Sequence, residues 1–326
     1  MEPGDEEEHI SAHSRTSFST LLTGFAYTAH SSTTNSTARP VLGVDQPISS
    51  PRKRKRIEEE DQGVGIVSAK KREGVISHLP PLQDRLALYL DVVFCGCNPG
   101  HTSAVVGLHY GNTQNAFWKC LHGSGFTETV LHPTEGPNLP SKYNIGLTDL
   151  VTTPSHSFAD ISTQERRNSV LALLQKIARF KPRIVAFNSF AIWTDIANGL
   201  EPLRRSSFPP KSAKANKTRN GLKTAKEVSS ACITLEPPLG EDQLPPLKLE
   251  STKEKRTPQF LPWKIVYAEG ETLLIPLPGT SGANASYSLS EKIAFFKAVN
   301  DAVQSIKQGT MDTSHMARII VREDIV

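Results

Sequence analysis

Two polar loops, each following a short apolar run, contain the residues best placed to do chemistry. Residues 96–100 read Gly-Cys-Asn-Pro-Gly, and residues 278–284 read Pro-Gly-Thr-Ser-Gly-Ala-Asn. The amide of Asn98 in the first loop both donates and accepts hydrogen bonds, but it is neutral and cannot act as a strong general base. A site built on Asn98 would therefore work by positioning and electrostatics. The alternative is that Asn98 is an ordinary residue of an Asn-Pro-Gly turn.

The elements around these loops alternate between strands and helices. Three apolar runs bounded by turn residues are predicted as buried strands: residues 91–95, 183–187 and 272–277. Ser162 with Glu165, and Ser288 with Glu291, match the capping-box pattern, and apolar residues follow each pair at helical spacing. This alternation predicts an α/β fold, a three-layer α/β/α sandwich with a short central parallel sheet. Ligand sites in such sheets lie beyond the carboxyl ends of the strands, where both loops would meet.

The large apolar side chains are concentrated in about half of the 326 residues. Residues 79–200 and 261–308 hold 17 of the 22 aromatic residues, including all three tryptophans. A core needs these side chains, so we expect a folded domain over 79–308. We also expect a disordered N-terminal tail (1–78), a disordered insertion at about 201–260 and a C-terminal tail (309–326).

Several classes of protein are not expected. No stretch approaches the roughly 18–20 apolar residues of a membrane span, and the acidic start lacks the apolar region of a secretory signal. The chain has four cysteines, Cys95, Cys97, Cys120 and Cys232. They are too few and too irregularly spaced for a disulfide framework, which favours a reducing compartment. Neither the cysteines nor the histidines have the spacing of a zinc or iron–sulfur site, so no metal or cofactor is expected.

Five motifs, in order along the chain, resemble those of the mismatch-specific uracil/thymine-DNA glycosylases, a branch of the uracil-DNA glycosylase superfamily. They are Gly-x-Asn-Pro-Gly at 96–100, His-Tyr at 109–110, Asn-x-Phe-Trp-Lys at 115–119, Tyr-x-Ile-Gly-x-Thr at 143–148 and Lys-Pro-Arg at 181–183. The resemblance covers about residues 85–198 and 264–307. It implies a monofunctional DNA glycosylase that removes uracil mispaired with guanine and so initiates base excision repair. Thymine and other 5-substituted pyrimidines are further candidate substrates.

The resemblance also implies a role for individual residues. Asn98 would position the attacking water, and Phe117 would stack on the flipped base. Seven residues would line the base pocket: Cys97, Ser103, Ala104, His109, Tyr110, Asn115 and Asp149. The small side chains of Ser103 and Ala104 would leave room for a 5-substituent. A carboxylate at Asp149 would bond the base edge if protonated, or help to orient the water.

The second loop resembles the family's wedge, which fills the space of the flipped base in the duplex. It comprises Pro278, Gly279, Thr280, Ser281, Gly282, Ala283 and Asn284. The family commonly inserts Arg or Leu, whereas the small Ala283 would fill the gap poorly. The alternative is a simple Gly/Ser turn. The implied partner is double-stranded DNA with a G·U or G·T mismatch, bound by a monomer.

Two basic segments suggest further contacts. Residues 202–226 contain eight Lys or Arg and no acidic residue, which suits non-specific contact with DNA phosphates. The residues predicted to make this contact are Arg204, Arg205, Lys211, Lys214, Lys217 and Arg219. A merely solubilising loop is the alternative. Two further basic clusters resemble a two-part nuclear import signal, which predicts an import receptor as partner and a nuclear location. The first cluster is Arg52, Lys53, Arg54, Lys55 and Arg56, and the second is Lys70, Lys71 and Arg72. A solvated charge run is the alternative.

Two short motifs point to the small ubiquitin-like modifier. Lys248 lies in Leu-Lys-Leu-Glu, which resembles a conjugation site. Ile319, Ile320 and Val321 precede two acidic residues and resemble a strand that binds the modifier by adding to its sheet. Both patterns also occur by chance.

Two alternatives to the mismatch-specific enzyme remain open. One is a uracil-DNA glycosylase without mismatch preference, although those branches usually place Asp or Glu where Asn98 stands. The other is a non-catalytic DNA- or chromatin-binding protein that retains the fold, with which the small Ala283 is compatible. Cleavage of duplexes containing G·U, A·U or G·T separates the three.

Overall fold

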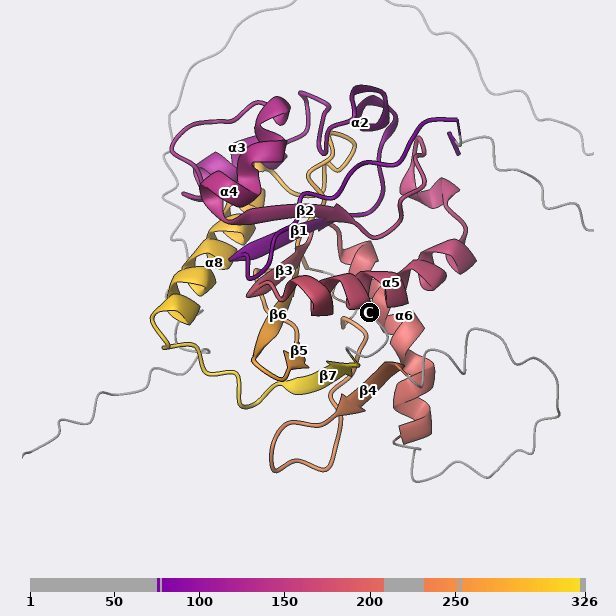
Figure 1. Cartoon of the computed structure of the whole chain (residues 1–326), viewed down its shortest axis with the longest axis vertical. Helices are drawn as coiled ribbons and strands as arrows, with labels where there is room; N and C mark the ends of the chain where they lie inside the picture. Colours follow the sequence, from indigo (N-terminus) through magenta and orange to yellow (C-terminus); the bar gives the residue numbers. More distant parts are fainter. Residues whose placement is uncertain (1–74, 77, 208–231, 251, 253, 323–326) are drawn as a thin grey trace, which may run out of the picture. The chain divides into compact units, whose positions relative to one another are not determined.

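A computed structural model of the chain describes residues 75–76, 78–207, 232–250, 252 and 254–322 (Figure 1). Some predictions concern residues outside these described ranges, so the structure does not test them. They concern the N-terminal tail up to residue 74, both import clusters, and Lys211, Lys214, Lys217 and Arg219 of the insertion.

A seven-stranded sheet, in the order β2-β1-β3-β6-β5-β7-β4, forms the centre of the fold. Its strands are β1 (Val92–Gly96), β2 (Ile145–Asp149), β3 (Ile184–Phe187), β4 (Ile233–Glu236), β5 (Trp263–Tyr267), β6 (Gly270–Pro276) and β7 (Ala317–Val321). The first four strands in this order are parallel, as are β5 and β7. Only β5 against β6 and β4 against β7 run antiparallel. The sheet is therefore mostly parallel, as expected for an α/β fold.

Helices cover both faces of this sheet (Figure 1). On one side lie α3 (Phe117–Gly123), α4 (Leu139–Tyr143) and α8 (Leu289–Lys307). On the other lie α5 (Thr163–Phe180) and α6 (Phe190–Ser207), which pack against each other. The short α2 (His101–Val106) follows β1, and two 3-10 helices, η1 (Pro133–Asn138) and η2 (Phe158–Asp160), lie in the connections. This arrangement confirms the predicted three-layer sandwich.

The middle of the sheet is buried on both faces, which is why its strands read as continuous apolar runs. All five residues of β1 are buried. On one face the Phe94 ring stacks on Phe296 of α8, with the centroids 4.9 Å apart. On the other, Phe187 of β3 meets Trp193 of α6 at 6.1 Å. These contacts hold the carboxyl ends of the central strands at fixed positions.

One predicted helix start is confirmed in full and the other in part. Ser288 and Glu291 form the complete capping box at the start of α8. At α5, the Ser162 hydroxyl accepts from the Glu165 backbone N–H, but the Glu165 carboxylate accepts from the Thr153 hydroxyl instead. This carboxylate therefore fixes the loop between β2 and α5.

The predicted disordered insertion at 201–260 is wrong for the residues described within it. Helix α6 continues to Ser207, and β4 adds an edge strand. Leu244 and Leu247 are buried, and the carbonyl of Leu247 accepts a hydrogen bond from the Trp193 indole at 2.7 Å. Enough apolar side chains are present here to order the chain around the end of the sheet.

The predicted C-terminal tail also contains part of the sheet. Strand β7 pairs with β5 on one side and β4 on the other, and Ile319 and Val321 are buried. The prediction that Ile319, Ile320 and Val321 add to a modifier's sheet is therefore wrong for this fold, because both edges of their strand are already paired. Lys248, by contrast, is exposed.

Candidate active site

Four loops at the carboxyl ends of β1, β2, β3 and β6 enclose a cleft of about 650 Å³. Most of the predicted site residues line it: Cys97, Asn98, Ser103, His109, Tyr110, Asn115, Asp149, and Gly279, Thr280, Ser281, Gly282, Ala283 and Asn284. The structure thus brings the two loops that the sequence singled out together at one site.

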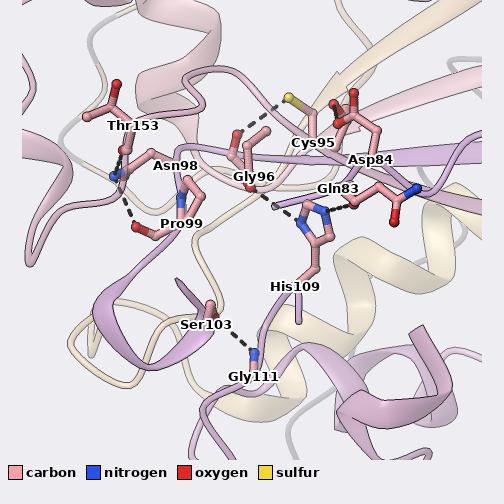
Figure 2. Close-up of polar contacts among 12 residues, drawn as sticks. Gln83, Asp84, Cys95, Gly96, Asn98, Pro99, Ser103, His109, Gly111 and Thr153 are labelled. Atoms are coloured by element: carbon pink, nitrogen blue, oxygen red, sulfur yellow. Dashed lines mark hydrogen bonds and ion pairs between the residues drawn. The ribbon is translucent and has the colours of Figure 1, made fainter. Parts of the chain in front are cut away.

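Asn98 is held by the loop that follows β2. Its Nδ2 donates to the carbonyl of Thr153 at 3.0 Å and to the hydroxyl of Ser155 at 2.7 Å, with a longer 3.3 Å contact to the carbonyl of Pro99. Figure 2 shows the amide directed at Thr153. Because these contacts use the amide hydrogens, the orientation of Oδ1 is fixed. Oδ1 takes no hydrogen bond from any residue that the structure describes, so it can accept one from a water or a ligand.

A second set of bonds fixes the partners of Asn98. The hydroxyl of Thr153 donates to Glu165 of α5, and the hydroxyl of Ser155 donates to the carbonyl of Ser157 at 2.7 Å. The backbone N–H of Ser155 also donates to the carbonyl of Pro99 at 3.0 Å. The loops after β1 and β2 are therefore joined into one rigid support for the Asn98 amide.

Tyr110 lines the cleft, as does Phe158, whereas Phe117 does not. The Phe117 side chain is fully buried, edge-on to Phe94 at 5.3 Å. The Tyr110 ring covers it, with the two ring centroids 3.8 Å apart and the planes 11° from parallel. The prediction that Phe117 stacks on a base is therefore wrong, because Phe117 is fully buried beneath the Tyr110 ring.

The backbone of Tyr110 is unusual. Its φ of 51° lies in the left-handed region, which is rare for an aromatic residue. The Trp118 indole donates to the Tyr110 carbonyl at 3.1 Å, and Trp118 is buried, as predicted for a core residue. The hydrogen bond and the stacking on Phe117 hold the Tyr110 ring at the cleft wall.

His109 and Asp149 form a contact at the inner end of the cleft. The His109 Nδ1 lies 3.4 Å from the Asp149 Oδ2, and the two side chains are only 4% and 10% exposed. The other imidazole nitrogen, Nε2, lies 3.2 Å from the carbonyl of Gln83 (Figure 2). Burial alone would lower the pKa of His109, but the charge and hydrogen bond of Asp149, with the Gln83 carbonyl, raise it above its usual value.

Gly96 makes room for the Asp149 carboxylate. The two residues are partners in the register of β1 and β2. A Cβ atom at position 96 would lie 2.2 Å from the Asp149 Oδ1, closer than any side chain tolerates. Glycine is therefore required here by the approach of Asp149, not by its own backbone angles.

The small residues at the site differ in their roles. Burial raises the pKa of Cys97 to about 12, so this thiol is protonated and is not a nucleophile at neutral pH. The Ser103 hydroxyl accepts from the backbone N–H of Gly111 at 3.0 Å. Ala104 is buried and does not line the cleft, so its predicted place in the pocket wall is wrong.

The loop at 278–284 is anchored at three points. The Asn188 side chain donates to the Thr280 hydroxyl at 2.8 Å, and the Ala116 N–H donates to the Thr280 carbonyl at 3.0 Å. The buried Lys292 of α8 donates to the Asn284 carbonyl at 2.9 Å. Residues 281–283 between these anchors are exposed. The first residue of the predicted wedge, Pro278, is buried outside the cleft lining.

Sequence reasoning missed several cleft residues. Ser155 and Asn188 follow the strands β2 and β3, as Asn98 follows β1. The rule about the carboxyl ends of parallel strands would have found them had it been applied to all four strands. His101 and His156, which stack at 5.4 Å, were missed as well.

Arg204 and Arg205 do not belong to the cleft. Helix α6 begins next to it, at Phe190, and Arg204 comes about 20 Å further along the helix axis. Arg204 and Arg205 contact Glu201 at 3.7 and 3.0 Å. If Arg204 and Arg205 contact DNA as predicted, they would do so away from the cleft.

No group of three or more His, Cys, Asp or Glu among the described residues is arranged to hold a metal ion. No helix in this part of the chain is long and apolar enough to cross a membrane.

Comparison with known families places the two loops and the strands of the cleft within one superfamily. A sequence model of the uracil DNA glycosylase superfamily matches residues 84–304, which include every strand of the cleft and both predicted loops.

Proposed function

The chain belongs to the uracil DNA glycosylase superfamily, and we propose that it is a monofunctional DNA glycosylase that removes uracil mispaired with guanine. Members of the superfamily hydrolyse the N-glycosidic bond of a base in DNA. Thymine and other 5-substituted pyrimidines opposite guanine are further candidate substrates. The product would be an abasic site, which starts base excision repair.

The observation that carries this proposal is the fixed amide of Asn98. Its donors are bound to Thr153 and Ser155, and Asn98 lines the cleft, so its Oδ1 is the atom that would accept a hydrogen bond from water. A neutral amide does not take the proton from that water. It holds the water in line with the sugar carbon while the base leaves, so catalysis rests on positioning.

The remaining cleft residues fit the other requirements of the reaction. A base must leave the helical stack before its glycosidic bond can be reached. The flipped base would stack on Tyr110, and its edge would face Asp149 at the end of β2. No lysine is among the described residues that line the cleft, which supports hydrolysis without a Schiff base and without strand cleavage.

The exposed tip of the 278–284 loop supports a preference for mismatches. Ala283 at this tip is small and would fill the gap left by a flipped base only partly. The stacking lost when a well-paired base leaves the duplex would then be replaced only in part, whereas a mispaired base costs less free energy to flip. We therefore expect G·U to be cleaved faster than A·U.

The test is cleavage of end-labelled duplexes that differ in one pair, G·U, A·U, G·T or G·C, under single-turnover conditions. Alkali converts abasic sites to strand breaks, and omission of alkali reports any lyase activity. We expect cleavage of G·U after alkali only. Equal rates on G·U and A·U would refute the mismatch preference, and no abasic site on any duplex would refute the enzyme and favour a non-catalytic DNA-binding protein.

A further inference from the structure

We propose that His109 and Asp149 form an ion pair whose carboxylate reads an imino N–H of the flipped base. This inference rests on the proposed function and names the base edge that the site would select. It assigns Asp149 an ionised state and makes His109 its counter-ion.

The charge state follows from the hydrogen-bond partners of His109. The Gln83 carbonyl, 3.2 Å from Nε2, can only accept, so Nε2 must carry a proton. The Nδ1 atom faces the Asp149 carboxylate at 3.4 Å, and this contact also needs one proton between the two groups. Because an oxygen acceptor faces each ring nitrogen, we assign this proton to His109, since an imidazolium donates from both nitrogens. Both contacts are then satisfied by an imidazolium beside a carboxylate.

The other charged groups near this pair balance one another. Asp84 precedes β1 and is the second carboxylate near His109. It pairs with Lys176 of α5 at 2.7 Å and accepts from the Thr148 hydroxyl at 2.6 Å. Without the charge on His109, the inner end of the cleft would carry the uncompensated charge of Asp149.

Asp149 lines the cleft, and its second carboxylate oxygen, Oδ1, is the one that we assign to the base. Oδ1 lies beside Gly96, where the missing side chain leaves space, and it has no hydrogen bond with the described residues. An ionised carboxylate accepts hydrogen bonds and does not donate them. It therefore favours an edge with an imino N–H, as in uracil, thymine and their 5-substituted forms. It disfavours the N3 of cytosine, which carries a lone pair instead.

The imidazolium also serves the bond-breaking step. Cleavage leaves negative charge on the departing pyrimidine, and an isolated carboxylate nearby would oppose it. His109 offsets the charge of Asp149, so the pair can bind the N–H without this repulsion. His109 is in this view a positioning residue that acts through Asp149.

The first test measures the charge of His109 directly and needs no activity. Imidazole ¹⁵N NMR of the full chain should show a doubly protonated His109 at neutral pH in the wild type. In Asp149→Asn the imidazole should lose the second proton at a lower pH. A neutral His109 at neutral pH in the wild type would overturn the ion pair, whether or not the protein is an enzyme.

The second test compares uracil with N3-methyluracil opposite guanine in single-turnover reactions. We expect the wild type to cleave uracil at least about tenfold faster, the factor for one buried hydrogen bond. In Asp149→Ala, which also removes any steric conflict with the methyl group, uracil excision should slow and the two rates should converge. Equal rates in the wild type, or discrimination that persists in Asp149→Ala, would overturn the assignment. Failure of the wild type on G·U would instead refute the proposed function.

Discussion

The Tyr110 ring lies flat on the Phe117 ring, with the centroids 3.8 Å apart and the planes 11° from parallel. Phe117 is fully buried, whereas Tyr110 lines the cleft, so the pair joins the core of the domain to its site. The two residues should therefore respond differently to substitution, one in activity and the other in stability.

Loss of the Tyr110 ring should affect excision. Tyr110→Ala is expected to slow single-turnover cleavage of G·U about 10- to 100-fold, because stacking of a base on an aromatic ring is worth roughly 1–3 kcal/mol. Tyr110→Phe keeps the ring and should stay close to wild type. Phe117→Leu should lower the unfolding free energy by about 1–2 kcal/mol and slow cleavage less than Tyr110→Ala, because the Trp118 indole still holds the Tyr110 carbonyl. If Phe117→Leu lost more activity than Tyr110→Ala, our assignment of the stacking ring would be wrong.

Ser155 should matter through Asn98. Its hydroxyl accepts from the Asn98 amide at 2.7 Å, so Ser155→Ala frees one amide hydrogen and loosens the water-binding oxygen. We expect a fall of about five- to tenfold in the single-turnover rate, equivalent to roughly 1 kcal/mol. Ser157→Ala is the matched control, because Ser155 donates to the Ser157 backbone and not to its side chain. Equal rates for the two variants would argue against this support of Asn98.

A larger side chain at the tip of the 278–284 loop should help base flipping. The loop is anchored at Thr280 and Asn284, so Ala283→Arg changes its tip without moving its ends. The A·U rate is expected to rise about three- to tenfold, and the G·U rate less, because the paired base costs a few kcal/mol more to extract. The exposed Ala285→Arg adds the same charge outside the tip. An equal gain from Ala285→Arg would mean that the charge, not the filled gap, is responsible.

The His109–Asp149 contact should appear in the pH dependence of stability. Since the pKa of His109 is raised in the folded protein, its stabilising effect is complete below the unfolded value of about 6.5. It is lost as the pH rises through the raised value. The free energy of unfolding in urea should therefore be higher for wild type than for His109→Gln at low pH, and this difference should shrink as the pH rises. A difference that grew with pH would contradict the raised pKa.

The fold and part of the site were predictable from local patterns. Asn98 follows the apolar run at 91–95 and the 278–284 loop follows the run at 272–277, and the rule for parallel sheets places the ends of such runs together. Ser288 and Glu291 marked a helix start through their spacing alone. Each of these signals lies within a few residues of sequence.

The errors came from features that depend on tertiary packing. Tyr110 and Phe117 are both aromatic, and nothing local tells which ring covers the other. The strand at Ile319–Val321 was assigned to an external partner, because nothing local shows that β4 and β5 of the same chain pair with it. Ser155 carries no pattern of its own and gains its role only by contact with Asn98.

The most direct test of the account is single-turnover cleavage of a G·U duplex by Asn98→Ala. Asn112→Ala is the matched control, because Asn112 also lines the cleft but bonds only within its own loop, to Gln114. The account predicts a loss of at least about 100-fold for Asn98→Ala, as for removal of one preorganised polar group, with binding to the duplex retained. Asn112→Ala should remain close to wild type. Undiminished cleavage by Asn98→Ala would contradict the assignment of this cleft as the site of base removal.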